Sequence, residues 1–210
     1  MGLCCNLGNI LDVFDTAIKG NSWVESETFW GIPVTTEEMF ATIAKKGIKT
    51  IRIPVTWHTH LVDTKYTIDP DWMRRVKTVI DWAIKHGFYV IINSKHDNAQ
   101  HLVDKMSYGE GYYPSSKDLI ESERFIYIIR TQIAIAFNNV YDHHLIFEVL
   151  SEPRLTGYKY DKFYDKGYSY CNAAIKALNT YQKLIAKVFG GNNAKRFFMI
   201  TLYSLDIKVP

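Results

Sequence analysis

Short continuous apolar runs alternate along this chain with longer segments in which apolar residues recur at helical spacing. Short apolar runs bounded by turn residues are typical of buried strands, and long periodic segments are typical of helices. The predicted strands cover residues 2–5, 50–55, 89–93, 145–150 and 196–201. The predicted helices cover residues 35–46, 69–86, 122–137 and 168–189. This alternation predicts an α/β fold with a parallel sheet, built from four βα units and a fifth strand.

Local signals mark the ends of two of these helices. The spacing of Thr35 and Glu38 matches a capping box, and Gly47 follows the last periodic residue of that helix. Asp69 and Pro70 predict the cap and first turn of the next helix, because proline tolerates the first helical position. No linker or low-complexity tract interrupts the pattern, so we expect one domain over residues 1–210.

Composition narrows the class of protein. The chain is 47% apolar and carries 25 basic against 22 acidic residues, which is ordinary for a globular domain and gives no reason to expect nucleic acid or membrane as partners. No apolar run approaches the roughly 20 residues that span a bilayer. The three cysteines fit neither a disulfide framework nor a zinc spacing, so we expect buried thiols, and we expect no metal ion and no cofactor. The first residues, Met-Gly-Leu-Cys-Cys, show no signal-peptide pattern.

The strongest candidate for chemistry follows the fourth predicted strand. Residues 145–154 read Leu-Ile-Phe-Glu-Val-Leu-Ser-Glu-Pro-Arg, which places Glu152 at the carboxyl end of a parallel strand, where α/β enzymes carry catalytic groups. An isolated Glu-Pro would simply close the strand. The whole decapeptide, however, resembles the acid/base strand of glycoside hydrolase family five, the cellulase-type (β/α)8 barrels, and departs from it at Ser151, where the family has asparagine.

Further segments resemble the same family in the same order. Residues 6–12, Asn-Leu-Gly-Asn-Ile-Leu-Asp, and residues 27–33, Glu-Thr-Phe-Trp-Gly-Ile-Pro, are similar to segments that line its glucose-binding cleft, and Thr-Trp-His at 56–58 also matches. The resemblance implies a group of substrate-binding residues. They are Asn6, Asn9, Trp30 and His58. Trp30 is either a platform for a sugar ring or a core residue, and the sequence favours neither.

Three positions around the expected site would support catalysis. Arg52 stands inside an apolar strand and therefore needs a carboxylate partner or water. The resemblance implies that this arginine braces the nucleophilic glutamate. Lys95 occupies the place of the family's fixed histidine and is expected close to Glu152, whereas His96 keeps the second histidine of the motif.

The resemblance implies an incomplete TIM (β/α)8 barrel and an endo-β-1,4-glucanase-like, retaining activity on a β-glucan. A retaining site needs two carboxylates about 5–5.5 Å apart. Glu152 matches the acid/base, but the family's nucleophile lies on the seventh strand, beyond these 210 residues, and Glu148 stands about 13 Å back along its own strand. We therefore expect impaired or absent hydrolysis by this chain alone. The family resemblance also implies a secreted protein.

Two other functions remain open at this point. The chain could bind glucan without chemistry, or it could self-associate as a homodimer through the open edges of its sheet. In the second case we expect the uncovered face to carry Ile51, Ile53, Val90, Ile92, Ile146 and Phe198, or their alternating neighbours. Arg52 should then reach a carboxylate across the dimer or turn to solvent.

Overall fold

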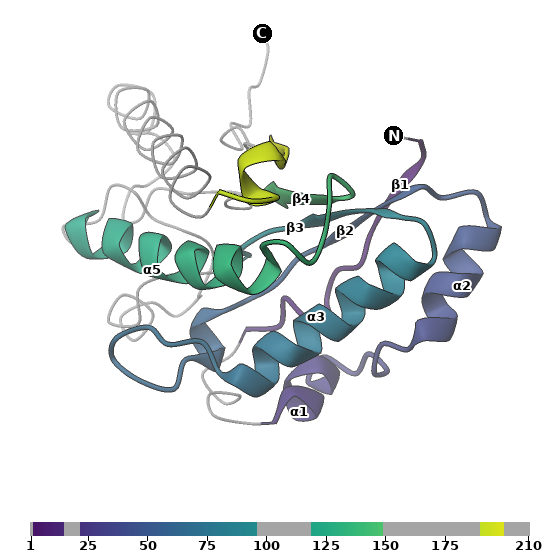
Figure 1. Cartoon of the computed structure of the whole chain (residues 1–210). Helices are drawn as coiled ribbons and strands as arrows, with labels where there is room; N and C mark the ends of the chain where they lie inside the picture. The colour runs from purple at the N-terminus through teal and green to yellow at the C-terminus, as the bar shows by residue number, and fades with distance from the viewer. Residues whose placement is uncertain (1, 15–21, 96–118, 149–189, 200–210) are drawn as a thin grey trace, which may run out of the picture.

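The computed structural model describes residues 2–14, 22–95, 119–148 and 190–199, and within them five strands form one parallel sheet in the order β1-β2-β3-β4-β5 (Figure 1). Successive strands are neighbours throughout, as the incomplete barrel requires. The strands are β1 (Cys4–Asn6), β2 (Thr50–Ile53), β3 (Tyr89–Ile92), β4 (Leu145–Glu148) and β5 (Phe198–Met199). The predicted α/β fold is confirmed for this part of the chain.

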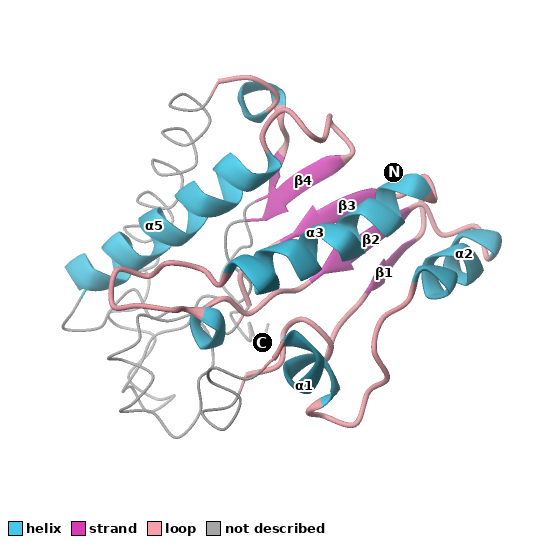
Figure 2. Cartoon of the chain, turned by 60° about the horizontal axis from the view of Figure 1, so that its bottom comes forward, coloured by secondary structure: helices cyan, strands magenta, loops and turns pink. Residues whose placement is uncertain are grey.

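The helices between the strands cover one face of the sheet (Figure 2). They are α1 (Trp23–Thr28), α2 (Glu37–Lys45), α3 (Pro70–Lys85) and α5 (Leu119–Phe137), with short 3-10 turns η2 (His58–His60) and η4 (Asn193–Lys195). The predicted start of α3 is confirmed, because the Asp69 side chain accepts the Asp71 N–H and Pro70 is the first helical residue. Within the described residues no helix is both long and apolar enough to span a membrane. The helix predicted over 168–189 lies outside the described residues.

The predicted capping box of α2 is wrong by one residue. Thr36, not Thr35, is the N-cap of this helix. Thr35 is buried, and its N–H donates to the Glu27 carboxylate at 2.8 Å, eight residues earlier in the chain. A tertiary contact thus fixes Thr35, and the helix begins after it.

The core lies between the sheet and its helices. Ile51, Ile53, Val90 and Ile92 are fully buried there against residues of α2, α3 and α5. Phe198 of β5 pairs in register with Phe147 of β4, so these two side chains lie on the same face of the sheet. Of the two alternatives for the open side of the sheet, the one that places these side chains there is therefore wrong, because the helices sit on that side.

Of the residues expected on the open side, Ile146 alone is there, and the alternating neighbours supply the rest. Arg52 pairs in register with Ile91, Ile91 pairs with Ile146, and Glu148 follows two residues along β4, so the four share one face. The sequence pattern could not decide between the two faces, since both are apolar along β3 and β4.

Two smaller expectations also fail. The thiol of Cys4 is exposed and that of Cys5 is only partly buried, because β1 is the first strand of the described sheet; the third cysteine, Cys171, lies outside the described residues. The fifth strand begins later than predicted, because Arg196 is not part of it, and its predicted end at 200–201 lies outside the described residues. The Arg196 guanidinium instead donates to the backbone oxygens of Phe137, Tyr141, Asp142 and Leu145, and so ties the entry of β5 to the turn before β4.

Candidate active site

The candidate site lies at the carboxyl ends of the strands, beginning with the loop after β1. Asn9 adopts a left-handed conformation, with φ of 65°, that asparagine tolerates better than most residues. The carboxylate of Asp12 holds this turn by accepting the N–H of Ile10 at 3.1 Å and that of Asn9. Asp12 is buried, and burial raises the pKa of its carboxyl group, against the lowering effect of these hydrogen bonds and of the Lys95 charge. The position of Asn9 is thus set by a residue three positions later.

Beneath this edge, one carboxylate joins three strands. Glu148 on β4 accepts the Arg52 Nε–H at 2.7 Å and an Nη2–H at 3.0 Å, and it also accepts the side-chain N–H of Asn93 at 3.1 Å. Arg52 donates through Nη1 to the Asn6 side chain at 3.1 Å, which adds β1. The side chain of Glu148 is 2% exposed and that of Arg52 is 22% exposed. A bidentate arginine–carboxylate pair in such a site is rigid and directional.

This network tests the expectations for Arg52. The carboxylate partner that Arg52 needs is Glu148 of the same chain, so the expectation of a turn to solvent is wrong. A carboxylate across a dimer stays a prediction. Pairing of β2 with β3 and of β3 with β4 brings the two residues together across the sheet face. Sequence reasoning missed Asn93. Its signal was a lone amide at the end of an apolar strand.

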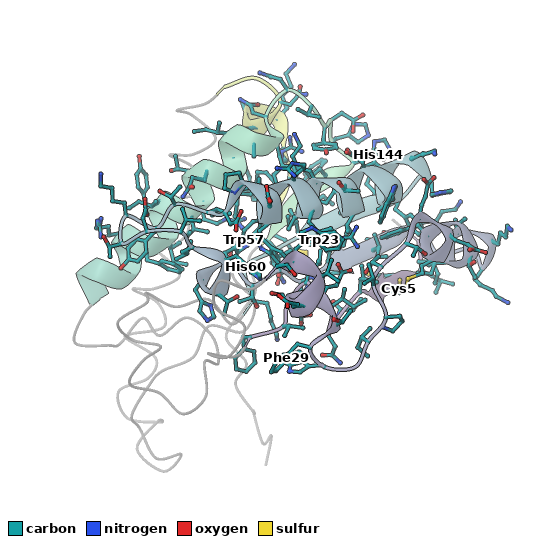
Figure 3. The ribbon with its side chains drawn as sticks, turned by 90° about the horizontal axis from the view of Figure 1, so that it is seen from below. Cys5, Trp23, Phe29, Trp57, His60 and His144 are labelled. Atoms are coloured by element: carbon teal, nitrogen blue, oxygen red, sulfur yellow. The ribbon has the colours of Figure 1, made fainter. Side chains whose placement is uncertain are left out.

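The segment after β2 packs two rings against the site. The indole N–H of Trp57 donates to the Asn93 backbone oxygen at 3.3 Å. His60 stacks on Trp72 with ring centroids 3.7 Å apart, and burial lowers the pKa of His60 to about 3, with a smaller contribution from the charge of His58. Figure 3 labels Trp57 and His60 in this segment. His58, expected to bind substrate, is itself only 5% exposed, so little of its surface is accessible to a ligand.

Lys95 and Trp30 stand at the rim of the site. Lys95 follows β3, and its backbone is fixed on both sides, donating to Val55 at 2.8 Å and accepting the Thr56 hydroxyl at 2.9 Å. The Lys95 charge acts to lower the pKa of Asp12, so Lys95 lies on the side of the site that the loop after β1 forms. Trp30 is 38% exposed and meets Phe14 edge-to-face at 5.8 Å, so it is not a core residue. His96, Ser151 and Glu152 lie outside the described residues, and so does the expected approach of Lys95 to Glu152.

A buried ion pair anchors the Trp30 segment, and sequence reasoning missed it. Arg75 on α3 donates to both oxygens of Glu27, at 2.9 and 3.0 Å, and also to the backbone oxygen of Thr35. Glu27 is fully buried, and the Arg75 guanidinium lies over the ring of Trp23 at 4.5 Å. The segment that carries Trp30 is therefore fixed to α3 at both of its ends.

These residues can position a polar ligand at the edge of the sheet. Asparagine side chains and an exposed tryptophan are suited to sugar hydroxyl groups and to the apolar face of a sugar ring. The described residues supply the amino-terminal side of such a site, and the strand that leads to Glu152 is its fourth.

Comparisons with known proteins agree with this arrangement. The model of the family described as "Cellulase (glycosyl hydrolase family 5)" matches residues 13–196. Endoglucanase A of Clostridium longisporum is 37% identical over 100% of this chain and 40% of its own length. Endoglucanase A of Ruminococcus albus is 36% identical over 95% of this chain and 50% of its own length. The chain thus spans about half the length of these curated relatives.

Solved structures give the same result. The chain is similar, with a TM-score of 0.80 and 35% identity, to a broad-specificity endoglucanase from Clostridium longisporum, over 97% of this chain and 54% of that one. A family 5 enzyme from Prevotella bryantii, solved with a xyloglucan tetradecasaccharide, has a TM-score of 0.81 at 32% identity, over 97% of this chain and 55% of that one. A Caldicellulosiruptor lichenase, solved with cellotetraose, has a TM-score of 0.78 at 38% identity, over 96% and 52% of the two chains.

Proposed function

Because the chain belongs to glycosyl hydrolase family 5, we propose that it forms the amino-terminal part of an endo-β-1,4-glucanase-type retaining site in which Glu152 is the general acid/base. The observation that carries this proposal is the position of the strand bearing the Glu152 motif. It is the fourth strand of a parallel sheet, and a network of side-chain hydrogen bonds ties it to the first three. In this role Glu152 protonates the leaving glycosidic oxygen and later activates water.

The proposed substrate is a β-1,4-linked glucan. Structures of relatives contain cellotetraose and a xyloglucan tetradecasaccharide, which supports this substrate class. On this chain, Asn6 and Asn9 would bind hydroxyl groups, and Trp30 would stack on a sugar ring. A polymeric glucan is met outside the cell, so the proposal includes secretion, which detection of the protein in culture supernatant would test.

Glu152→Gln tests the catalytic role. Glutamine has nearly the same shape but cannot donate the proton, so we expect reducing-sugar release from β-glucan to fall by about 10²–10⁴-fold. The 210-residue chain contains the proposed acid/base and not the strand on which the family resemblance places the nucleophile, so its own activity is expected to be weak or absent. The variant is therefore also assayed in a longer chain that includes all eight strands. An unchanged rate there would reject Glu152 as the acid/base.

A second candidate function is glucan binding without hydrolysis, which the exposure of Trp30 favours. Replacing Trp30 with Ala removes a partly exposed ring that lies outside the core, so we expect cellulose pull-down to weaken with little change in stability. Val62→Ala is a matched control, because this side chain is 59% exposed and lies in the turn before α3. Equal pull-down of the Trp30 variant and the parent chain would show that the ring does not contact glucan.

Self-association is a third proposal, for the 210-residue chain alone. Among the described strands, β1 and β5 each pair on one side, and Phe197 and Met199 near β5 are 62% and 40% exposed. Such edges are templates for pairing with a second copy. Sedimentation across a hundredfold concentration range tests this. A monomer at every concentration would reject it.

A further inference from the structure

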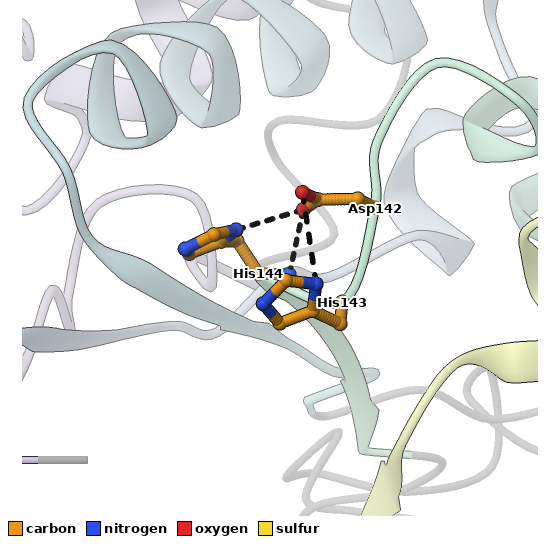
Figure 4. Close-up of side chains that lie close together, drawn as sticks. All are labelled: Asp142, His143 and His144. Atoms are coloured by element: carbon orange, nitrogen blue, oxygen red, sulfur yellow. Dashed lines mark hydrogen bonds and ion pairs between the residues drawn. The ribbon is translucent and has the colours of Figure 1, made fainter.

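Three potential metal ligands meet at the opposite end of the sheet from the candidate active site. Asp142, His143 and His144 form the turn between α5 and β4, and one ligand atom from each lies within 4.8 Å of the others (Figure 4). The expectation of no metal ion rested on the spacing of the cysteines and did not take the Asp-His-His run at 142–144 into account. We propose that these three side chains form a surface site for a divalent transition-metal ion, with Zn²⁺ as the best fit.

The distances suit a shared ion. Oδ1 of Asp142 lies 2.8 Å from Nδ1 of His144, and Oδ2 of Asp142 lies 3.7 Å from Nδ1 of His143. Ligand atoms about 2.0–2.1 Å from a tetrahedral Zn²⁺ stand roughly 3.3–3.5 Å from one another. The two observed separations bracket that value, and one ligand atom from each residue lies within 4.8 Å of the other two, so modest rotations of these exposed side chains would gather both nitrogens and a carboxylate oxygen around the ion. Each ring would bind the ion through Nδ1 and carry its one proton on Nε2.

The turn is already held in place, which lowers the entropy cost of binding. The backbone N–H of His144 donates to the Asp142 carboxylate at 2.9 Å, and the ring of His144 stacks on Tyr89 at 4.6 Å. The buried guanidinium of Arg196 donates to the backbone oxygen of Asp142 at 3.0 Å and not to its carboxylate. That charge opposes a second cation, but it leaves the carboxylate oxygens available as ligands.

The chemistry of the donors selects the ion. Two imidazoles and one carboxylate suit Zn²⁺, Ni²⁺ or Cu²⁺ far better than Mg²⁺ or Ca²⁺, which prefer oxygen ligands. The three side chains are 36% to 61% exposed, which leaves room for water as the fourth ligand and for entry of the ion. Because the site lies at the amino ends of the strands, we expect the ion to stabilise the turn rather than to take part in catalysis.

The experiment is calorimetric titration of metal-free protein with ZnCl₂ at pH 7.5. A Cys4→Ser background is used, because the exposed thiol of Cys4 would itself bind zinc. We expect one saturable site whose affinity falls about tenfold or more in His143→Gln and in His144→Gln. His143 is 55% exposed, so its replacement keeps the fold even if that of His144 does not. The unfolding temperature of the parent chain should rise with Zn²⁺ concentration and should return to its metal-free value when EDTA is added.

His86→Gln is the matched control. Nε2 of His86 also lies beside a carboxylate, 3.1 Å from Glu37, but His86 does not belong to the cluster of Asp142, His143 and His144. Its replacement should therefore leave the zinc affinity unchanged. Absence of saturable binding would overturn the proposal. So would an affinity that is unchanged in both the His143 and His144 variants, or one that falls equally in the His86 variant, since the ion would then bind elsewhere.

Discussion

Replacing Glu148 with Gln tests how much the network beneath the candidate site contributes to folding. The carboxylate accepts three hydrogen bonds, two from Arg52 and one from Asn93, and its side chain is 2% exposed. Removing one partner of a buried ion pair costs about 3–5 kcal/mol, because the other charge stays buried and unpaired. Here Arg52 is 22% exposed and glutamine keeps one acceptor oxygen, so we expect a loss of about 2–3 kcal/mol.

The assay is urea unfolding with thermal unfolding in parallel. For a chain of this size, each kcal/mol lowers the melting temperature by about 2–4 °C, so the expected decrease is about 4–12 °C. Arg52→Gln should cost a similar amount. The double variant should be less destabilised than the sum of the two, with a coupling energy of about 1–3 kcal/mol.

Asp71→Asn provides the comparison. Asp71 pairs with Arg74 one turn along α3, and both side chains are more than half exposed, at 65% and 71%. Surface pairs of this kind contribute about 0–1 kcal/mol. Equal losses in the Glu148 and Asp71 variants, or additive losses at Glu148 and Arg52, would refute the view that the buried pair acts as a unit.

Two further predictions concern buried polar groups. His60 stays neutral in the folded chain down to pH about 3, whereas in the unfolded chain it binds a proton below its ordinary pKa of 6.5. The contribution of the neutral ring to stability is therefore complete above pH 6.5 and is lost as the pH falls towards 3. Lowering the pH from 7.5 to 4.5 should decrease the free energy of unfolding of both proteins, but the decrease should be about 2–3 kcal/mol smaller in His60→Gln than in the parent. An equal pH dependence in the two proteins would contradict this. The Tyr141 hydroxyl donates to Asp81 at 2.5 Å, and burial together with that carboxylate raises its pKa. Tyr141→Phe should lower stability by about 1–2 kcal/mol in urea unfolding at pH 7, and an unchanged midpoint would show that the bond contributes nothing.

Much of the fold could be predicted from sequence because its signals are local. Strand and helix periods differ, and Asp69, Pro70 and Gly87 mark the ends of α3 within a few residues of sequence. The start of α2 could not be predicted in this way, because the contact that fixes Thr35 comes from Glu27 and Arg75 in other elements. Long-range partners leave no trace in a local pattern.

The same distinction separates the predicted and missed parts of the site. Arg52 was recognisable as a charge that needed a partner, but an apolar run that is buried on both faces does not say which side chains share a face. Only the register of β2, β3 and β4 identifies Glu148 and Asn93 as its neighbours. The exposure of Trp30, which the sequence left open, likewise follows from packing of its segment on α3.

The described part of the candidate site is therefore held in place by the hydrogen-bond network beneath it and not by its loops alone. Glu148 orients Arg52, Arg52 orients Asn6, and Asn93 joins both Glu148 and the Trp57 indole. The links through Glu148 and Asn93 are buried or partly buried, where side chains have few alternative partners, whereas the link from Arg52 to Asn6 is exposed. A change at Glu148 should thus move groups on β1, on β3 and in the loop after β2 together, which is the behaviour of a preorganised site and not of independently mobile loops.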